Sequence, residues 1–167
     1  RMTNRITTVV IPATSRVDNE KLTKIKNLIQ DGVPYLENIT KCRYYPVPTI
    51  ILDEIPCEDR EQFGDPEDND SYKAIHKLGV YFHPGKTVSQ NISKILKNYG
   101  YNDAFIDSLA TGGFVVMGYE QCKRLAEREN KACGIEFFWD IFMAVLIHEH
   151  AHAITFEGIE NNSQFNY

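Results

Sequence analysis

Three histidines and a glutamate fall within five positions near the end of the sequence, in LIHEHAHAITFEG at residues 146–158. If this segment is helical, residues four apart lie on one face, one turn apart, so His148 and His152 are neighbours with Glu149 beside them. Two imidazoles at this spacing can bind one Zn²⁺, and the adjacent carboxylate can reach a water on the metal. The pattern predicts a zinc site with His148 and His152 as ligands.

The chemistry that this group of residues supports is hydrolysis. Zn²⁺ lowers the pKa of a bound water from 15.7 to about 7. Glu149 can then take a proton as hydroxide attacks a carbonyl carbon, and can pass it to the leaving amine. Glu149 is therefore the predicted general base of a hydrolase that cleaves peptide bonds.

The residues before the motif are strongly apolar, in FFWDIFMAVLI at 137–147. They predict a long helix from Ile135 to about Phe156 that is apolar on almost every side and lies in the interior of the domain. Burying imidazoles and a carboxylate without partners costs several kcal/mol, and a bound metal removes that conflict. The alternative is a hydrogen-bonded core cluster without metal.

His150 differs from the other two histidines in its place on the helix. It lies about 160–200° around the axis from His148 and His152, and so it cannot share their metal while the helix is regular. We expect a hydrogen-bonded imidazole on the opposite face.

At these residues the sequence resembles the zincin metallopeptidases, whose consensus allows an apolar segment such as VLIHEHAHAI before and through the motif. The resemblance implies an α+β, zincin-like fold in which a small, mostly antiparallel, twisted sheet packs against helices. The long buried HExxH helix would lie beneath that sheet, near the C-terminus. One strand would form the rim of the cleft, where an extended peptide substrate adds, and the candidates are strands at Val80–Phe82 and at Phe114–Met117.

A catalytic zinc takes three protein ligands and a water, and the third ligand is open. The metzincin subfamily is excluded, because Thr155 and Gly158 stand where its pattern has Gly and His. The gluzincin pattern is closer, and it takes a Glu from a later helix. The acids after the motif are Glu157, which would point away on a continuing helix, and Glu160.

Gly158 is a plausible residue to end the helix and turn the chain back. Three alternatives for the third ligand follow: Glu157 or Glu160, a residue beyond Tyr167 if the chain is part of a longer protein, or no protein ligand at all. Tyr167 is also the one downstream candidate for stabilising an oxyanion. We expect His76 and His83 to be surface imidazoles.

Peptide deformylases also carry HExxH near the C-terminus, with a cysteine as third ligand. The surroundings of Cys122 and Cys133 do not match that family, and its glycine-rich segment has no counterpart here. A second hypothesis from another class is a catalytically inactive, zincin-like binding or scaffold module with an incomplete metal site.

Composition limits the number of domains and the classes of partner that we expect. With 167 residues, 43% hydrophobic and 25% charged, we expect one globular domain. A net charge of −5, from 18 Lys and Arg against 23 Asp and Glu, gives no reason to expect nucleic acid. The longest apolar run, residues 141–147, is too short to span a membrane. Four cysteines without a CxxC pair favour buried thiols over a disulfide framework and leave the compartment unknown.

The remaining segments predict the elements around the motif. The acidic segment at 53–70 is interpreted as a solvated loop, because its residues do not fit an EF-hand. We expect strands at 5–12, 44–55 and 77–82, a buried strand at 112–118, and helices at 18–32, 87–100, 103–110 and 119–132.

Overall fold

The computed structural model describes residues 8–56, 78–133 and 137–161, without the side chains at 131–133 and 158–161. The described chain forms five helices and a four-stranded sheet. In order these are β1 (Val10–Ala13), α1 (Asn19–Thr40), β2 (Thr49–Leu52), β3 (Gly79–Phe82), α4 (Gln90–Asn98), α5 (Asp103–Gly112), β4 (Phe114–Gly118), α6 (Tyr119–Cys133) and α7 (Phe138–Asn161).

The sheet has the strand order β1-β2-β4-β3 and is mixed. Strands β1, β2 and β4 are parallel to one another, and β3 is antiparallel to β4 at one edge. The α+β class is confirmed, but the prediction of a mostly antiparallel sheet is wrong. The helix α1 connects the end of β1 with the start of β2. It returns the chain to the end of the sheet at which β1 began, and so the two strands run parallel.

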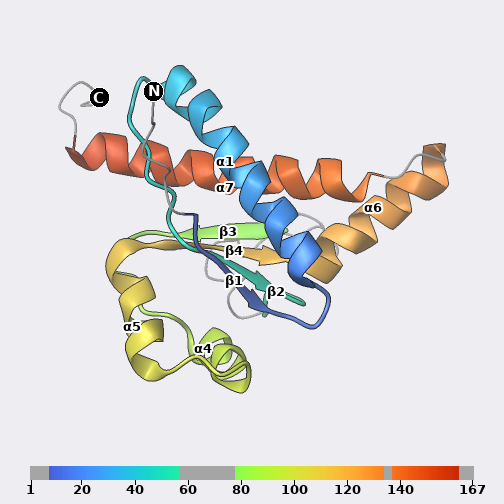
Figure 1. Ribbon diagram of the computed structural model, residues 1–167, viewed down its shortest axis with the longest axis horizontal. Coiled ribbons are helices and arrows are strands. Elements are labelled where there is room, and N and C mark those ends of the chain that lie inside the picture. Colours follow the sequence, from blue (N-terminus) through green and yellow to red (C-terminus); the bar gives the residue numbers. More distant parts are fainter. Residues whose placement is uncertain (1–7, 57–77, 134–136, 162–167) are drawn as a thin grey trace, which may run out of the picture.

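Helices cover both faces of the sheet (Figure 1). Alternate residues of each strand point to opposite faces, so each strand supplies two cores. The core toward α1 and α7 includes Val10, Ile51, Tyr81, Val115 and Met117. The core toward α4 and α5 includes Ile11, Ile50, Phe82, Val116, Ile92, Leu96 and Ile106.

Helix α1 begins as predicted and ends later. The Asp18 side chain caps it by accepting a hydrogen bond from the Lys21 N–H at 2.9 Å. The predicted end at Gly32 is wrong, because the helix continues to Thr40. Gly32 instead lies directly against the side chain of Ile147 on α7, where a Cβ atom would overlap it. The glycine therefore permits a close crossing of two helices and is not a stop.

Helix α7 is the predicted long helix, and it continues through Gly158 to Asn161. The predicted end at Gly158 is wrong, since glycine permits a left-handed turn but does not require one. The helix is also less buried than predicted. Phe142 and Leu146 on the sheet side are fully buried, whereas Met143 and Ala144 are exposed.

Other predictions are confirmed or shifted by a few residues. The helix predicted at 87–100 is α4, which begins at Gln90 after the cap residue Ser89, whose side chain accepts a hydrogen bond from the Ile92 N–H. Strand β4 is buried at every position. Cys122 is a buried free thiol and Cys42 a half-buried one. The acidic residues at 58–70, with Cys57 and His76, lie outside the described residues.

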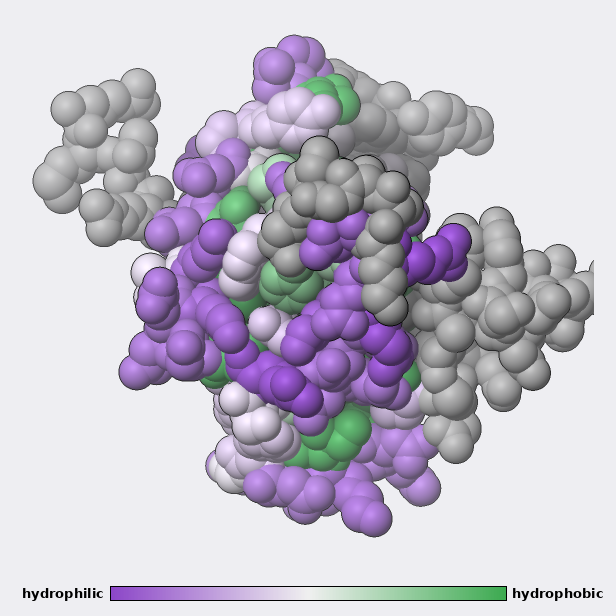
Figure 2. All heavy atoms as spheres, turned by 90° about the vertical axis from the view of Figure 1, so that its right-hand side faces the viewer, coloured by the Kyte–Doolittle hydropathy of each residue, from purple (hydrophilic) through white to green (hydrophobic). Residues whose placement is uncertain are grey.

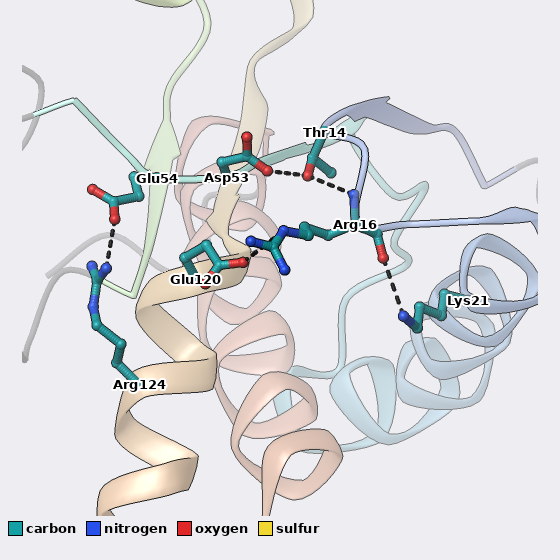
Figure 3. Close-up of polar contacts among 7 residues, drawn as sticks. All are labelled: Thr14, Arg16, Lys21, Asp53, Glu54, Glu120 and Arg124. Carbon is teal, nitrogen blue, oxygen red and sulfur yellow. Dashed lines mark hydrogen bonds and ion pairs between the residues drawn. The ribbon is translucent and has the colours of Figure 1, made fainter.

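The carboxyl ends of the three parallel strands carry a network of polar side chains (Figure 3). The Thr14 hydroxyl, after β1, donates to the Asp53 carboxylate, after β2. Arg16 pairs with Glu120 at 3.0 Å, and Arg124 pairs with Glu54 at 2.5 Å. Ligands of parallel sheets often bind at such an edge, and here these side chains pair with one another. The surface on this side of the molecule is mostly hydrophilic (Figure 2).

Candidate metal centre

His148 and His152 lie side by side on α7, as predicted. They lie on its exposed side, however, so the expectation that both imidazoles are buried is wrong. Their Nε2 atoms are 3.1 Å apart, and the two rings are nearly perpendicular, at 88°. Two nitrogens about 2.0–2.1 Å from a tetrahedral zinc are about 3.3 Å apart, so the pair fits that ion. Burial and the neighbouring His148 lower the pKa of His152, which favours the neutral imidazole that a metal requires.

Glu149 lies at the edge of the same site but is buried. Its residue is 7% exposed, and its Oε1 lies 4.0 Å from Nε2 of His148. The carboxylate therefore lies near Nε2 of His148, at the border between the buried and the exposed side of α7. This is the arrangement that the sequence predicts for a general base.

Gly79, the first residue of β3, makes room for Glu149. A Cβ atom at residue 79 would lie 3.0 Å from Cγ of Glu149 and 2.8 Å from Cγ1 of Val145. Both distances are shorter than ordinary contacts between side chains, so any larger residue would displace one of the two. Gly79 is not predictable as part of this site from the sequence, because no local pattern shows that the start of β3 meets α7.

Strand β3 is the better of the two candidates for the rim of a cleft. β4 has a partner on each side, β2 and β3, so its backbone groups are already used in the sheet. Among the described strands, β3 pairs on one side only and packs against α7. The edge of β3 that has no partner among the described strands is therefore the candidate for the rim, and the strand itself packs against the helix that carries Glu149.

The described part of the chain brings no third His, Cys, Asp or Glu to the pair. Glu157 is half-buried. Burial raises the pKa of Tyr44 and Tyr81, and the charge of Glu157 raises both further. Glu157 lies toward these tyrosines, two turns after His150, and burial raises its own pKa. The alternative in which Glu157 is the third ligand is therefore not supported, while the side chain of Glu160 lies outside the described set.

His150 occupies the opposite side of α7, as predicted, and both its ring nitrogens have partners. Nδ1 lies 2.5 Å from the Tyr44 hydroxyl, and Nε2 lies 2.8 Å from the Thr49 hydroxyl. The residue is 1% exposed, and burial lowers its pKa to about 4. The ring is therefore neutral near pH 7. Tyr44 and Thr49 were missed because they lie about a hundred residues away in the sequence.

His83 lies on the surface, as predicted, just after β3. Its ring stacks on Phe156, with centroids 4.9 Å apart and an interplanar angle of 11°. Phe156 is one helical turn beyond His152, so the stack places a third imidazole on the same side of the molecule as the exposed pair. Tyr167 lies outside the described residues.

Comparisons with known proteins do not extend these observations. No protein-family model, curated protein or solved structure matches the chain. Within the described residues, none of the helices has the length and apolar character needed to cross a membrane. The case for a function therefore depends on the geometry where α7 meets β3.

Proposed function

We propose that this protein is a zinc-dependent peptidase of zincin-like type, closer to the gluzincin than to the metzincin pattern. The observation that carries the proposal is the 3.1 Å separation of the Nε2 atoms of His148 and His152, with the Glu149 carboxylate 4.0 Å from one of them. Zinc held by these imidazoles would supply a Lewis acid that lowers the pKa of water at the site.

Glu149 would act as the general base. Its carboxylate would accept a proton from the attacking water and deliver it to the amine that leaves when the peptide bond breaks. Because the side chain is confined between α7 and Gly79, it keeps its position without losing rotamer freedom on each turnover. This confinement supports a catalytic role more than a solvated surface role.

The substrate would be an extended peptide that pairs with the edge of β3 that has no partner among the described strands. A strand edge offers backbone N–H and C=O groups at the spacing of a second strand, and it binds peptides without regard to most of their side chains. Since Gly79 begins β3 and contacts Glu149, a peptide paired with this strand would lie close to the general base.

A second candidate is a zincin-like binding or scaffold module without turnover. It is favoured by the finding that, within the described ranges, only two candidate ligands converge. Such a module would bind zinc weakly through His148 and His152 and would gain nothing from a general base. The two candidates therefore differ in what the loss of the Glu149 carboxylate would do.

The test compares the full-length protein with Glu149→Gln and with Glu127→Gln, an exposed control on α6. Elemental analysis measures bound zinc, and quenched fluorescent peptides measure cleavage. We expect all three proteins to bind zinc, and Glu149→Gln to lower kcat by roughly 10²- to 10⁴-fold, the usual contribution of a general base. Equal cleavage by wild type and Glu149→Gln, or no cleavage by zinc-loaded wild type, would reject the peptidase.

A further inference from the structure

The apolar residues of α7 do not by themselves fix how the helix is rotated about its axis. Its apolar side chains lie on all sides, so Phe142 and Leu146 are buried against the sheet while Met143 and Ala144, of similar character, face solvent. A helix with one apolar stripe has one favoured orientation, whereas a helix that is apolar all round has several of similar free energy. Besides the close contact of Ile147 with Gly32, polar contacts can therefore select the observed orientation.

The hydrogen bonds of His150 can make that selection. Its two ring nitrogens bind hydroxyls of Tyr44 and Thr49, which both lie outside α7 in the segment that leads into and begins β2. All three residues are at most 1% exposed, so water does not replace a lost partner. A rotation that breaks either bond leaves a buried polar group unsatisfied, which is far more unfavourable than exchanging one apolar contact for another.

We propose that His150 is a positioning residue for the candidate site, which fixes the rotation of α7 relative to the sheet. It thereby places Glu149 against Gly79 while His148 and His152 face solvent. This inference rests on the proposed peptidase function. Single buried polar residues fix the register of coiled coils in the same way, through specificity more than through stability.

Small rotations of α7 should matter for the position of Glu149, because its side chain is packed closely against Gly79 of β3. Side chains extend about 5–6 Å from a helix axis, so a rotation of about 10° moves them by about 1 Å. A displacement of that size in a catalytic group can lower turnover by about 10²-fold. The spacing of His148 and His152, by contrast, is internal to the helix and survives the same rotation. Loss of His150 bonding should therefore impair turnover more than zinc binding.

The test removes the whole polar cluster without leaving an unpaired group, in Tyr44→Phe/Thr49→Val/His150→Leu. Thr49→Val alone is the second variant, in case the triple variant does not fold. Tyr101→Phe is the matched control, since it loses a tyrosine hydrogen bond, to the Pro12 carbonyl, on the other face of the sheet. Measurements are the urea midpoint, zinc affinity, kcat and KM with a quenched peptide, and the NMR amide signal of Gly79 without metal.

We expect both variants of the cluster to shift or split the Gly79 amide signal and to lower kcat at least about tenfold, with KM and zinc affinity within about twofold of wild type. Tyr101→Phe should leave the Gly79 signal and kcat unchanged. An unaltered Gly79 signal in the folded variants, even with a lower urea midpoint, would overturn the positioning role. If wild type cleaves no peptide, the peptidase proposal fails, and the Gly79 signal still decides the role of His150.

Discussion

Histidines on the two sides of α7 differ in burial and in hydrogen bonding. His150 is 1% exposed and has both ring nitrogens bonded to hydroxyls, while His148, two residues earlier, has a side chain that is 66% exposed. The difference comes from what each side faces. The sheet side supplies Tyr44 and Thr49, and the open side supplies, among the described residues, the neighbouring His152.

This contrast separates structural from ligand-binding histidines on physical grounds. A buried imidazole must have its partners in the folded protein itself, because no water can supply them. An exposed pair at four-residue spacing is stable without a ligand and keeps its nitrogens accessible to one. The motif HEHAH therefore holds one histidine whose ring nitrogens are both bonded inside the protein and two exposed histidines that are the proposed metal ligands.

The largest effect should follow from removing one member of the exposed pair. His148→Ala deletes one of the two proposed ligands. We therefore expect zinc affinity to fall by about 100-fold or more, which is at least the usual effect of changing a residue that only supports a ligand. Thr155→Ala, on the same exposed side, is the control and should bind zinc as wild type does. Competition with a chelator measures the affinity. Equal affinity of His148→Ala and wild type would place the metal elsewhere.

The buried histidine should make folding stability depend on pH. Its pKa is lowered to about 4 in the folded state from 6.5, so between these values the unfolded chain binds more protons. The contribution is complete above pH 6.5 and is lost as the pH falls toward 4, by about 3 kcal/mol in total. Urea unfolding from pH 7.5 to 4.5 measures it. The His150→Leu triple variant should lose this part of the pH dependence, and an identical profile would contradict the assignment.

Substitution of two glycines tests whether the contact between Gly79 and Glu149 is needed for turnover. Gly79→Ala would press on Glu149 and Val145, and we expect turnover to fall by about 10- to 100-fold through displacement of the base. Gly112→Ala is the matched control, because nothing lies within 4 Å of a Cβ there. Peptide cleavage and zinc affinity, measured together, distinguish displacement of Glu149 from loss of metal. Undiminished turnover in Gly79→Ala would show that the contact is not needed.

The smallest effect should come from removing the hydroxyl of Tyr44 on the buried side of α7. Tyr44→Phe removes the partner of Nδ1 of His150 and leaves the ring in place, so the free energy of unfolding should fall by about 1–3 kcal/mol. Tyr35→Phe, on the exposed part of α1, is the control and should unfold as wild type does. Urea denaturation measures both, and equal midpoints would show that the bond contributes nothing.

The sequence predicts what depends on local spacing and misses what depends on distant contacts. The HExxH helix, the opposite placement of His150 and the buried strand β4 follow from periodicity within a few turns. The partners of His150, the glycine beside Glu149 and the parallel direction of β1 and β2 depend on which segments meet. Gly32 shows the reason: a glycine in a helical pattern can end the helix or admit a neighbour, and only packing decides between them.

The crossing at Gly32 also limits how the candidate centre can change shape. Because Ile147 fills the space that any other side chain at residue 32 would need, α1 and α7 are interlocked one residue before His148. Neither helix can slide or tilt alone without losing that contact. If the proposed peptide substrate needs the site to open, β3 is therefore the element that can move without breaking the contact between the two helices.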